Sequence, residues 1–161
     1  MMQKSDACLT FGPLKRRHLP QMAEIERACF SDPWSEQSLA DEVDNPLADY
    51  YLCEENGLLL GYLGTRKLPG QWEIVNVAVR PRARRRHIAS RLMELLLADA
   101  AAGDARQIFL EVRESNLPAR RLYEAYGFTC LGRRKRYYSD PEEDALIMAR
   151  ITDHVEADSC H

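Results

Sequence analysis

The stretch VAVRPRARRRHIASRLM, residues 77–93, decides the fold of this chain. It combines a short β-branched run that is typical of a buried strand, an arginine-rich loop, and the first turns of an amphipathic helix. The first N–H groups of a helix have no intrahelical partner, and the helix dipole adds partial positive charge there. A helix that follows a strand through a short cationic loop is therefore suited to bind a phosphate at its N-terminus.

The charge of the whole chain points to a small anionic partner rather than to nucleic acid. The net charge is −3, although the quoted stretch holds six arginines: Arg80, Arg82, Arg84, Arg85, Arg86 and Arg91. Generic nucleic-acid affinity favours a basic domain, whereas a local basic patch on an acidic chain suits a small polyanion. We therefore expect no direct binding of nucleic acid.

Length and composition predict one globular domain. The 161 residues can form a sizeable core, and 45% hydrophobic with 29% charged residues is an ordinary balance. No apolar run approaches the ~18–20 residues that a membrane span needs, and the N-terminus lacks the apolar region of a signal peptide. The five cysteines are scattered without a CxxC pair, which favours a reducing cytoplasm over a disulfide framework or a zinc site.

Hydrophobic periodicity and turn signals predict strands and helices along most of the chain. A strand over 8–14 precedes two helices, one from Leu19 for about three turns and one from the N-cap Ser35 to Asn45-Pro46. Strands over 49–54 and 58–66 are joined by Asn56-Gly57, a strong hairpin signal. The later elements are a strand over 71–79, a helix over 86–102 with Gly103 as its C′ residue, a strand over 107–113, a helix capped by Ser115 or Asn116 and ending at Tyr126-Gly127, and strands over 129–137 and 144–151.

This order of elements predicts an α/β (α+β) fold. A mixed, mostly antiparallel sheet of about seven strands with helices on both faces is the natural packing. The strand–helix–strand over 71–113 should form a right-handed parallel crossover. We expect a single domain over residues 1–151, and we expect the polar residues 152–161 to be a disordered tail.

Three segments in this order resemble the GNAT acetyltransferases: VAVRPRARRRHIASRLM (77–93), FLEVRESNLPARRLYEAYGF (109–128) and EDALIMAR (143–150). Within that superfamily the chain is most similar to the RimI type, the alanine N-acetyltransferases of a small-subunit ribosomal protein. The closer similarity rests on FSDPWSE (30–36), NVAVRP (76–81), LEVRESN (110–116), LYEAYGF (122–128) and RRKRYY (133–138). The resemblance implies a sheet with a central, splayed parallel pair of strands.

The resemblance also implies a binding site for acetyl-CoA. The phosphate loop of the family reads Q/R-x-x-G-x-G/A, and the matching residues are Arg84, Arg85, Arg86, His87, Ile88 and Ala89, with His87 in place of the usual glycine. The amides from Arg85 to Ser90 would hold the pyrophosphate, and the arginines would meet the phosphates. The main chain of Val77, Ala78 and Val79 would hold the pantetheine arm as an added strand does. The simpler alternatives are a solvated arginine face and ordinary core valines.

The catalytic residues are likewise implied by the resemblance. Glu111 lies in the apolar strand FLEVR, where burying a carboxylate is costly, and the RimI type has its general base at this position. Glu73 is the alternative base and otherwise a substrate-binding residue. Tyr123 would be the general acid that protonates the departing thiolate, and Asn116 would both cap its helix and bond the cofactor. The alternatives are an arginine-paired carboxylate for Glu111 and simple packing for Tyr123, while Tyr126 is predicted to be a core residue.

Three aromatic residues are predicted to shape the peptide groove: Trp34, Tyr137 and Tyr138. Trp34 follows a proline turn and fits a hydrophobic plug equally well. The histidines at positions 18, 154 and 161 have no neighbours that suggest ligands, so we predict no metal site.

Together these features predict a cytoplasmic N-terminal protein acetyltransferase that uses acetyl-CoA as co-substrate. Its expected partner is a protein N-terminus, with the N-terminal alanine of a small-subunit ribosomal protein as the implied target and direct transfer in a ternary complex as the implied mechanism. We expect no membrane partner, and a monomer or weak dimer. The alternatives are a GNAT enzyme that acetylates lysine or a small amine, and a binding module whose cofactor loop His87 has impaired.

Overall fold

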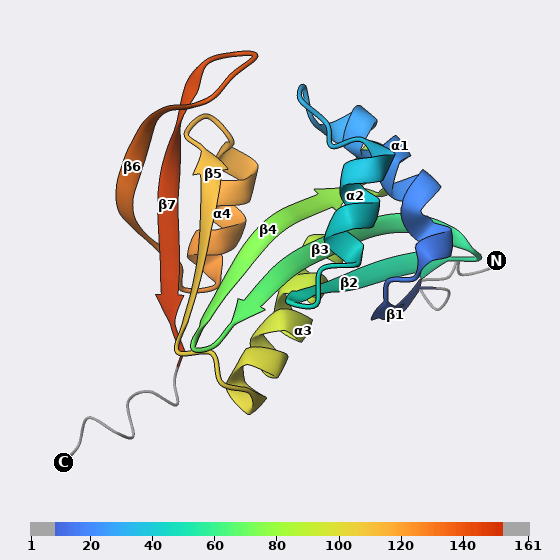
Figure 1. Ribbon diagram of the computed structural model, residues 1–161, viewed down its shortest axis with the longest axis horizontal. Helices are drawn as coiled ribbons and strands as arrows, with labels where there is room; N and C mark the ends of the chain where they lie inside the picture. Colours follow the sequence, from blue (N-terminus) through green and yellow to red (C-terminus); the bar gives the residue numbers. More distant parts are fainter. Residues whose placement is uncertain (1–8, 153–161) are drawn as a thin grey trace. The chain divides into compact units, whose positions relative to one another are not determined.

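The computed structural model describes residues 9–152, which follow the predicted order of strands and helices (Figure 1). The first strand was predicted over 8–14, and its residue 8 lies outside the described part. The elements are β1 (Leu9–Pro13), α1 (Leu19–Cys29), α2 (Glu36–Val43), β2 (Ala48–Glu55), β3 (Leu58–Leu68), β4 (Gln71–Val79), α3 (Ile88–Ala102), β5 (Gln107–Arg113), α4 (Leu117–Ala125), β6 (Thr129–Tyr138) and β7 (Glu143–Ile151). Short 3₁₀ turns at Arg16–His18 and Pro81–Ala83 precede α1 and α3.

The strands form one seven-stranded sheet in the order β1-β2-β3-β4-β5-β7-β6. The pair β4–β5 is parallel, with Gln71–Ile74 in register with Gln107–Leu110, while β5–β7 and β6–β7 are antiparallel. The predicted fold class, a mixed sheet with a central parallel pair, is therefore confirmed. The contacts group the chain into two compact units, and β3, β4 and α3 contribute residues to both.

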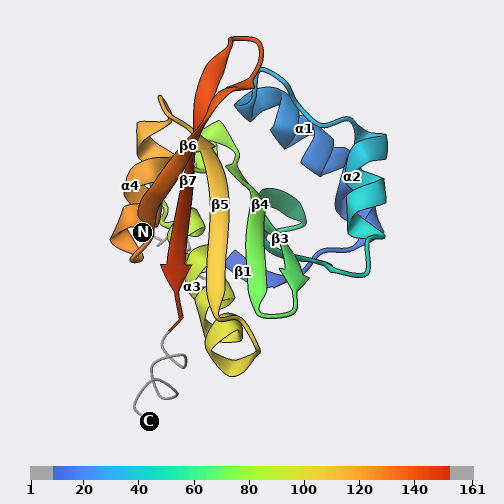
Figure 2. The ribbon, with the colours of Figure 1, turned by 60° about the vertical axis from the view of Figure 1, so that its left-hand side comes forward.

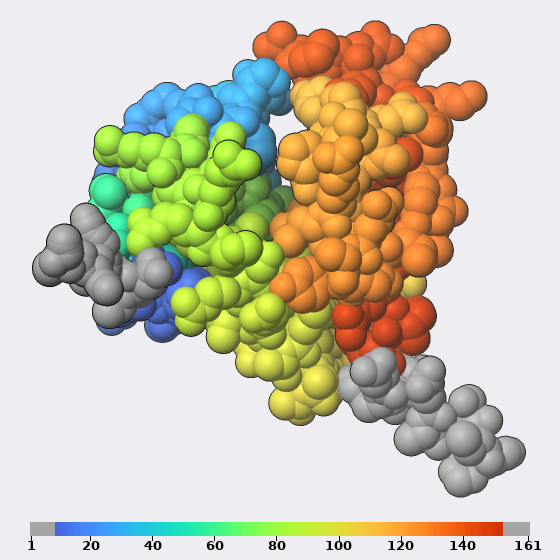
Figure 3. Space-filling view, turned by 180° about the vertical axis from the view of Figure 1, so that it is seen from behind, coloured from blue at the N-terminus to red at the C-terminus, as the bar shows by residue number. Residues whose placement is uncertain are grey.

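The first unit contains the described residues up to Thr65 together with Asn76–Leu96. Helices α1 and α2 lie on one face of β2 and β3, and the first turns of α3 lie on the other face (Figures 1 and 3). The apolar stripe of α1 packs on the sheet in a core formed by Leu19, Met22, Ala23, Ile25, Leu39, Tyr50, Leu52, Leu59, Tyr62 and Ala78. The predicted N-cap is confirmed, because the Ser35 hydroxyl accepts the Ser38 N–H at 3.1 Å.

The hairpin between β2 and β3 is built as its sequence predicts. Asn56 and Gly57 have φ values of +52° and +83°. This left-handed pair is the geometry of the two-residue turn that matches the twist of antiparallel strands. The turn fixes the register of β2 against β3, and thereby fixes which side chains face α1 and α2.

The second unit contains Arg66–Val75 together with Leu97 to Thr152. Strands β5, β7 and β6 run side by side, and α4 packs against them (Figure 2). Asn116 is the residue that caps α4, because its side-chain oxygen accepts the Ala119 N–H at 3.2 Å. Gly127 follows the helix with φ +88°, a left-handed conformation that glycine adopts without steric cost.

Two details at element ends differ from prediction. Gly103 follows α3, but its φ is not in the left-handed region that most C′ glycines adopt. Space is short here instead, because a Cβ would lie 3.1 Å from the Asp99 carbonyl oxygen and 3.1 Å from Trp72 Cζ2, and these neighbours would have to shift by a few tenths of an ångström. The tail prediction was wrong at Thr152, which is buried and whose N–H donates to the Arg106 carbonyl at 3.1 Å. The rest of that prediction, 153–161, lies outside the described residues.

Within the described residues, no helix has both the length and the apolar character needed to cross a membrane.

Candidate active site

The loop between β4 and α3 forms a pocket in the first unit. Its volume is about 240 Å³, and it is lined by Val79, Ala83, Arg84, Arg85, His87, Ile88, Ala89 and Ser90. In α3 the Arg91 N–H donates to the His87 carbonyl at 3.1 Å. The N–H groups of Ile88 and Ala89 come before Arg91, in the first turn of the helix. The structure thus gathers all the predicted loop residues except Arg86 around the first turn of a helix, where an anion is favoured.

His87, which stands where the family motif has glycine, takes a left-handed backbone conformation. Its φ is +62°, and Arg85 two residues earlier has φ +71°. Histidine is one of the non-glycine residues that enter the left-handed region more often than most, at a cost of about 1–2 kcal/mol. Left-handed residues in such turns orient successive N–H groups toward one point, which makes an anion-binding concavity. The substitution of histidine for glycine therefore leaves the loop in a phosphate-binding shape.

Four of the six arginines are held by other protein groups. Arg86 donates to both carboxylate oxygens of Glu55 at 3.0 and 2.9 Å, and this hydrogen bonding lowers the pKa of Glu55. Arg84 donates to the Val79 carbonyl at 3.3 Å, and Arg80 to the Leu59 carbonyl at 2.7 Å. The guanidinium of Arg91 lies 4.3 Å from the ring centroid of Phe11. These contacts fix the loop in place. The alternative of an arginine face that only meets solvent therefore does not describe these four side chains.

The main chain of β4 next to this loop is closely approached by β3. A Cβ added to Gly61 would lie only 2.8 Å from the Ala78 carbonyl oxygen. Ala78 is buried and Val77 and Val79 are half-buried, so the alternative of ordinary core residues holds for Ala78 and only in part for the two valines. Their predicted main-chain role toward pantetheine is compatible with this packing and stays a prediction.

Glu111 is the centre of a second group of predicted residues, in the second unit. Its side chain is 17% exposed, and its Oε2 lies 3.4 Å from Arg134 Nε without hydrogen-bond geometry. The Oε2 atom is buried and accepts no hydrogen bond from the described residues. The arginine contact foreseen as the alternative is therefore present, but one carboxylate oxygen keeps its acceptor capacity.

Two tyrosines of β6 face this carboxylate. Burial, and after it the Glu111 charge, raises the pKa of Tyr137, and the same causes raise the pKa of Tyr138 to about 12. The two ring centroids lie 5.0 Å apart, edge to face, and Tyr137 and Tyr138 lie at the end of a register shift between β6 and β7 that runs from Arg134 to Tyr138. Glu73 is close enough to contribute to the Tyr137 shift, and it pairs with Arg66 at 4.0 Å. The structure thus brings Glu111, Glu73, Tyr137 and Tyr138 together.

Tyr123 is the buried tyrosine of α4, and the prediction for Tyr126 was wrong. Tyr123 is 6% exposed and packs on Phe128 with ring centroids 5.8 Å apart, whereas Tyr126 is only half-buried. Burial raises the pKa of Tyr123 well above its usual value, so its hydroxyl stays protonated at neutral pH. A protonated phenol can donate a proton, but a raised pKa makes it a weaker acid, and the same packing would serve a purely structural residue.

Trp34 is half-buried and packs against the core of α1 and α2. This packing agrees with a hydrophobic plug, and its role in a peptide groove stays a prediction. Its main-chain N–H donates to Glu26 Oε1 at 3.0 Å. Glu26 was missed in the sequence, although one signal could have found it: Glu26 lies four residues after Met22 and four before Phe30, on the apolar stripe of α1.

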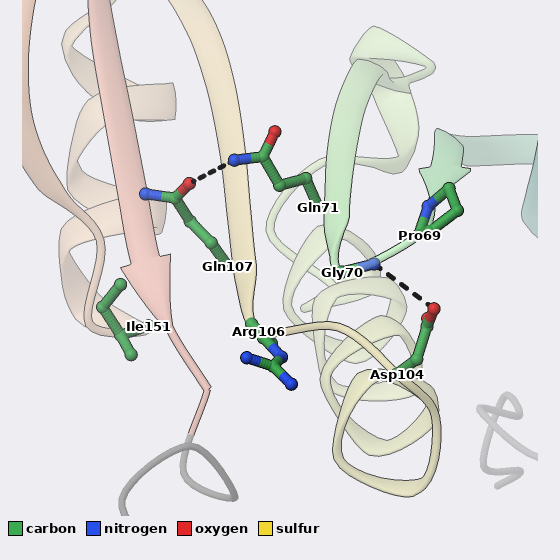
Figure 4. A pocket seen from close by; sticks show the side chains of 7 residues that line it. All are labelled: Pro69, Gly70, Gln71, Asp104, Arg106, Gln107 and Ile151. Atoms are coloured by element: carbon green, nitrogen blue, oxygen red, sulfur yellow. Dashed lines mark hydrogen bonds between the residues drawn. The ribbon is translucent and has the colours of Figure 1, made fainter. Parts of the chain in front are cut away.

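A larger hollow elsewhere in the second unit is not the candidate site. It measures about 740 Å³ and is lined by Pro69, Gly70, Gln71, Asp104, Arg106, Gln107 and Ile151 (Figure 4). Asp104 accepts the Gly70 N–H at 3.3 Å and the Trp72 indole N–H at 3.0 Å, so it anchors the beginning of β4. None of the predicted site residues lines this hollow, and its polar groups are used in fixing strand ends.

The fold is that of the N-acetyltransferases, and the chemistry of the two groups suits acyl transfer. The chain belongs to the acetyltransferase (GNAT) family, whose model matches residues 19–128. It is 37% identical over 136 residues to a Bacillus subtilis protein whose name assigns it provisionally to the ribosomal protein bS18-alanine N-acetyltransferases, covering 84% of this chain and 90% of that relative.

Two further relatives agree with this assignment. The chain is 34% identical over 148 residues to the N-alpha-acetyltransferase RimI of Mycobacterium tuberculosis, covering 88% of this chain and 92% of the relative. The crystal structure of the ribosomal-protein-S18-alanine N-acetyltransferase from Escherichia coli matches with a TM-score of 0.83 at 30% identity, covering 89% and 94%. The predicted RimI-type resemblance and the assignment as an N-acetyltransferase are confirmed.

Proposed function

We propose that this enzyme transfers the acetyl group of acetyl-CoA to the α-amine of a protein N-terminus, with the N-terminal alanine of ribosomal protein bS18 as its target. The names of two curated relatives, at 37% and 32% identity, support this target. The observation that carries the co-substrate is the pocket at the first turn of α3, where Arg85 and His87 hold left-handed conformations.

In this proposal the first unit binds the anionic part of acetyl-CoA. The amides from Arg85 to Ser90 receive the pyrophosphate, and Arg84 and Arg85 contribute positive charge. The pairing of Arg86 with Glu55 makes Arg86 a brace for the loop rather than a direct phosphate ligand. The main chain of Val77, Ala78 and Val79 binds the pantetheine arm, and one of its amides donates to the thioester carbonyl oxygen. Such a donor contributes ~10²–10³ in rate.

The second unit supplies the groups that move protons. The neutral α-amine attacks the thioester carbon, and the Glu111 carboxylate accepts the proton that the nitrogen loses as the amide forms, directly or through water. The C–S bond breaks, and the leaving thiolate takes a proton from the Tyr123 hydroxyl. Solvent then takes the proton from Glu111 and returns one to Tyr123. An α-amine has a pKa near ~8 against ~10.4 for lysine, so one base of ordinary strength is sufficient. Asn116 caps α4, and in this proposal it also bonds the co-substrate.

A panel of short peptides tests the proposal. We expect mass spectrometry to find one acetyl group on a peptide that begins with the N-terminal alanine sequence of bS18. The same peptide with a blocked N-terminus and a free internal lysine should stay unmodified. Acetylation of the lysine would instead assign the enzyme to the side-chain acetyltransferases, and failure of acetyl-CoA to bind in calorimetry would make the protein a binding module.

A further inference from the structure

Glu26 is a buried carboxylate to which the proposed function gives no role. It lies on α1 and is 1% exposed. Three donors converge on it: the Trp34 main-chain N–H on Oε1 at 3.0 Å, and the Asn76 side-chain amide and the Tyr62 hydroxyl on Oε2. All of these residues belong to the first unit.

The three donors match an acceptor-only group. A main-chain N–H can only donate, and a carboxylate can only accept. Burial, and after it the Glu26 charge, raises the pKa of Tyr62, so that its hydroxyl keeps the proton it donates. The carboxylate therefore has hydrogen bonds on both oxygens, which is the condition under which a charge can be buried.

The partners of Glu26 join two regions that the proposed function uses. Trp34 lies in the segment between α1 and α2 that is proposed to meet the peptide, and Asn76 directly precedes the main chain proposed to hold pantetheine. Tyr62, on β3, belongs to the hydrophobic core of the first unit, and its hydroxyl donates to the Glu26 carboxylate. An apolar residue of similar volume would fill this place at lower desolvation cost, so stability alone does not explain a glutamate here.

We propose that Glu26 is a positioning residue that fixes the Trp34 segment against β4 and thereby sets how tightly the substrate N-terminus binds. This inference rests on the proposed function. Glu26 acts through the Trp34 N–H and touches neither substrate. Its loss should therefore weaken peptide binding while leaving the chemical step and the phosphate pocket unchanged.

The test is the variant Glu26→Gln, with Glu24→Gln as its matched control. Glutamine has one acceptor oxygen, so it can satisfy donors on only one side, and its amide must face a donor on the other. We expect the KM for the alanine peptide to rise roughly tenfold, as for the loss of one charge-assisted hydrogen bond, with kcat and the KM for acetyl-CoA within about twofold of wild type. Glu24 lies on the same helix but is 56% exposed and pairs with Arg80 instead, so Glu24→Gln should leave kcat and the KM for the alanine peptide unchanged.

A second variant exchanges donor and acceptor. In Glu26→Gln combined with Asn76→Asp, the glutamine oxygen can accept the Trp34 N–H while its amide donates to the new carboxylate. We expect this pair to restore most of the peptide KM, which a general loss of packing would not do. Equal changes in kcat and in both KM values, or no recovery in the double variant, would overturn the positioning role.

Amide hydrogen exchange of the segment 30–35 separates this inference from the proposed function, because it needs no substrate. We expect faster exchange in Glu26→Gln than in wild type and in Glu24→Gln. If the wild-type enzyme acetylates no peptide, the proposed function fails while the exchange result still decides the role of Glu26. Unchanged exchange together with an unchanged peptide KM would refute the inference.

Discussion

The close approach of β3 to β4 predicts the effect of one added methyl group. The Cβ of Gly61→Ala would lie 2.8 Å from the Ala78 carbonyl oxygen, 3.1 Å from Val79 Cγ2 and 3.3 Å from Val79 Cα. A relaxed carbon–oxygen contact spans at least ~3.3 Å, so the two strands must separate by roughly 0.5 Å. The atoms that must move are main-chain atoms of β4, which cannot rotate away as a long side chain can.

Two magnitudes follow from this displacement. Overpacking of this kind costs about 1–3 kcal/mol of stability, and each kcal/mol lowers the Tm by about 2–4 °C in a chain of this size. A misplacement of about 1 Å can cost 10²-fold in catalysis, so half that distance should lower kcat/KM for acetyl-CoA by about tenfold. Both losses are expected because the same residues carry the packing and the proposed binding of pantetheine.

Thermal unfolding and steady-state kinetics measure the two losses, and Gly12→Ala is the control. Gly12 is also a strand glycine of the first unit, but a Cβ there would meet no heavy atom within 4 Å. Gly12→Ala should stay within about 0.5 kcal/mol of wild type and keep its kcat/KM. If Gly61→Ala lowers the Tm but leaves kcat/KM for acetyl-CoA unchanged, the main chain around Ala78 does not hold the co-substrate. An unchanged Tm would refute the packing argument itself.

Three further changes test the catalytic groups and the carboxylate pairs. Glu111→Gln should lower kcat by ~10²–10⁴ with nearly unchanged affinity for acetyl-CoA in calorimetry, and unchanged turnover would eliminate Glu111 as the base. Tyr123→Phe keeps the packing on Phe128 but removes the proton donor, so kcat should fall by ~10²-fold with little change in Tm; equal activity would return Tyr123 to a packing role. The pKa of Glu143 is held below its usual value of 4.5 by the Ser115 and Arg113 hydrogen bonds, and the pKa of Asp144 is lowered by Arg136 and Arg133. The hydrogen bonds to these two carboxylates contribute their full stabilisation above about pH 4.5, and this stabilisation is lost as the pH falls through the lower pKa values of the folded state. The Tm should therefore decline below about pH 4.5. A Tm that stays constant down to about pH 3 would contradict these pairs.

The features that the sequence predicted correctly are local ones. The strand over 71–79 was predicted with the bounds that β4 has, and the caps of α2 and the turn at Asn56-Gly57 follow from single residues whose side chain or backbone conformation decides the structure. Where two neighbouring residues could serve equally, as Ser115 and Asn116 could, only the structure identifies Asn116.

The features that were not predicted depend on partners distant in sequence. Arg86 fits the phosphate motif, but its pairing with Glu55 joins residues 31 positions apart. Gly103 was predicted from its place at the end of α3, where glycine is favoured for its backbone conformation. In the structure it is the Trp72 ring that leaves little space for a Cβ at this position. Tyr123 lies in the last turn of α4 and Tyr126 directly follows the helix, and the direction of the helix in the fold decides which of them is buried. Glu26 was missed because its three donors come from three different segments.

The arginines and the main-chain amides of the loop should govern different rate constants of anion binding. The arginines affect association, and the amides affect dissociation. Coulomb attraction acts over distances of about 8–10 Å at moderate salt, so arginines around the loop can raise the rate at which a polyphosphate arrives without touching it. Main-chain amides act only at contact, so they govern how long the ligand stays. For acetyl-CoA we therefore expect added salt to slow association while leaving dissociation almost unchanged. An arginine that is tied to a carboxylate, as Arg86 is to Glu55, adds little to either rate and serves instead to keep the amides in place.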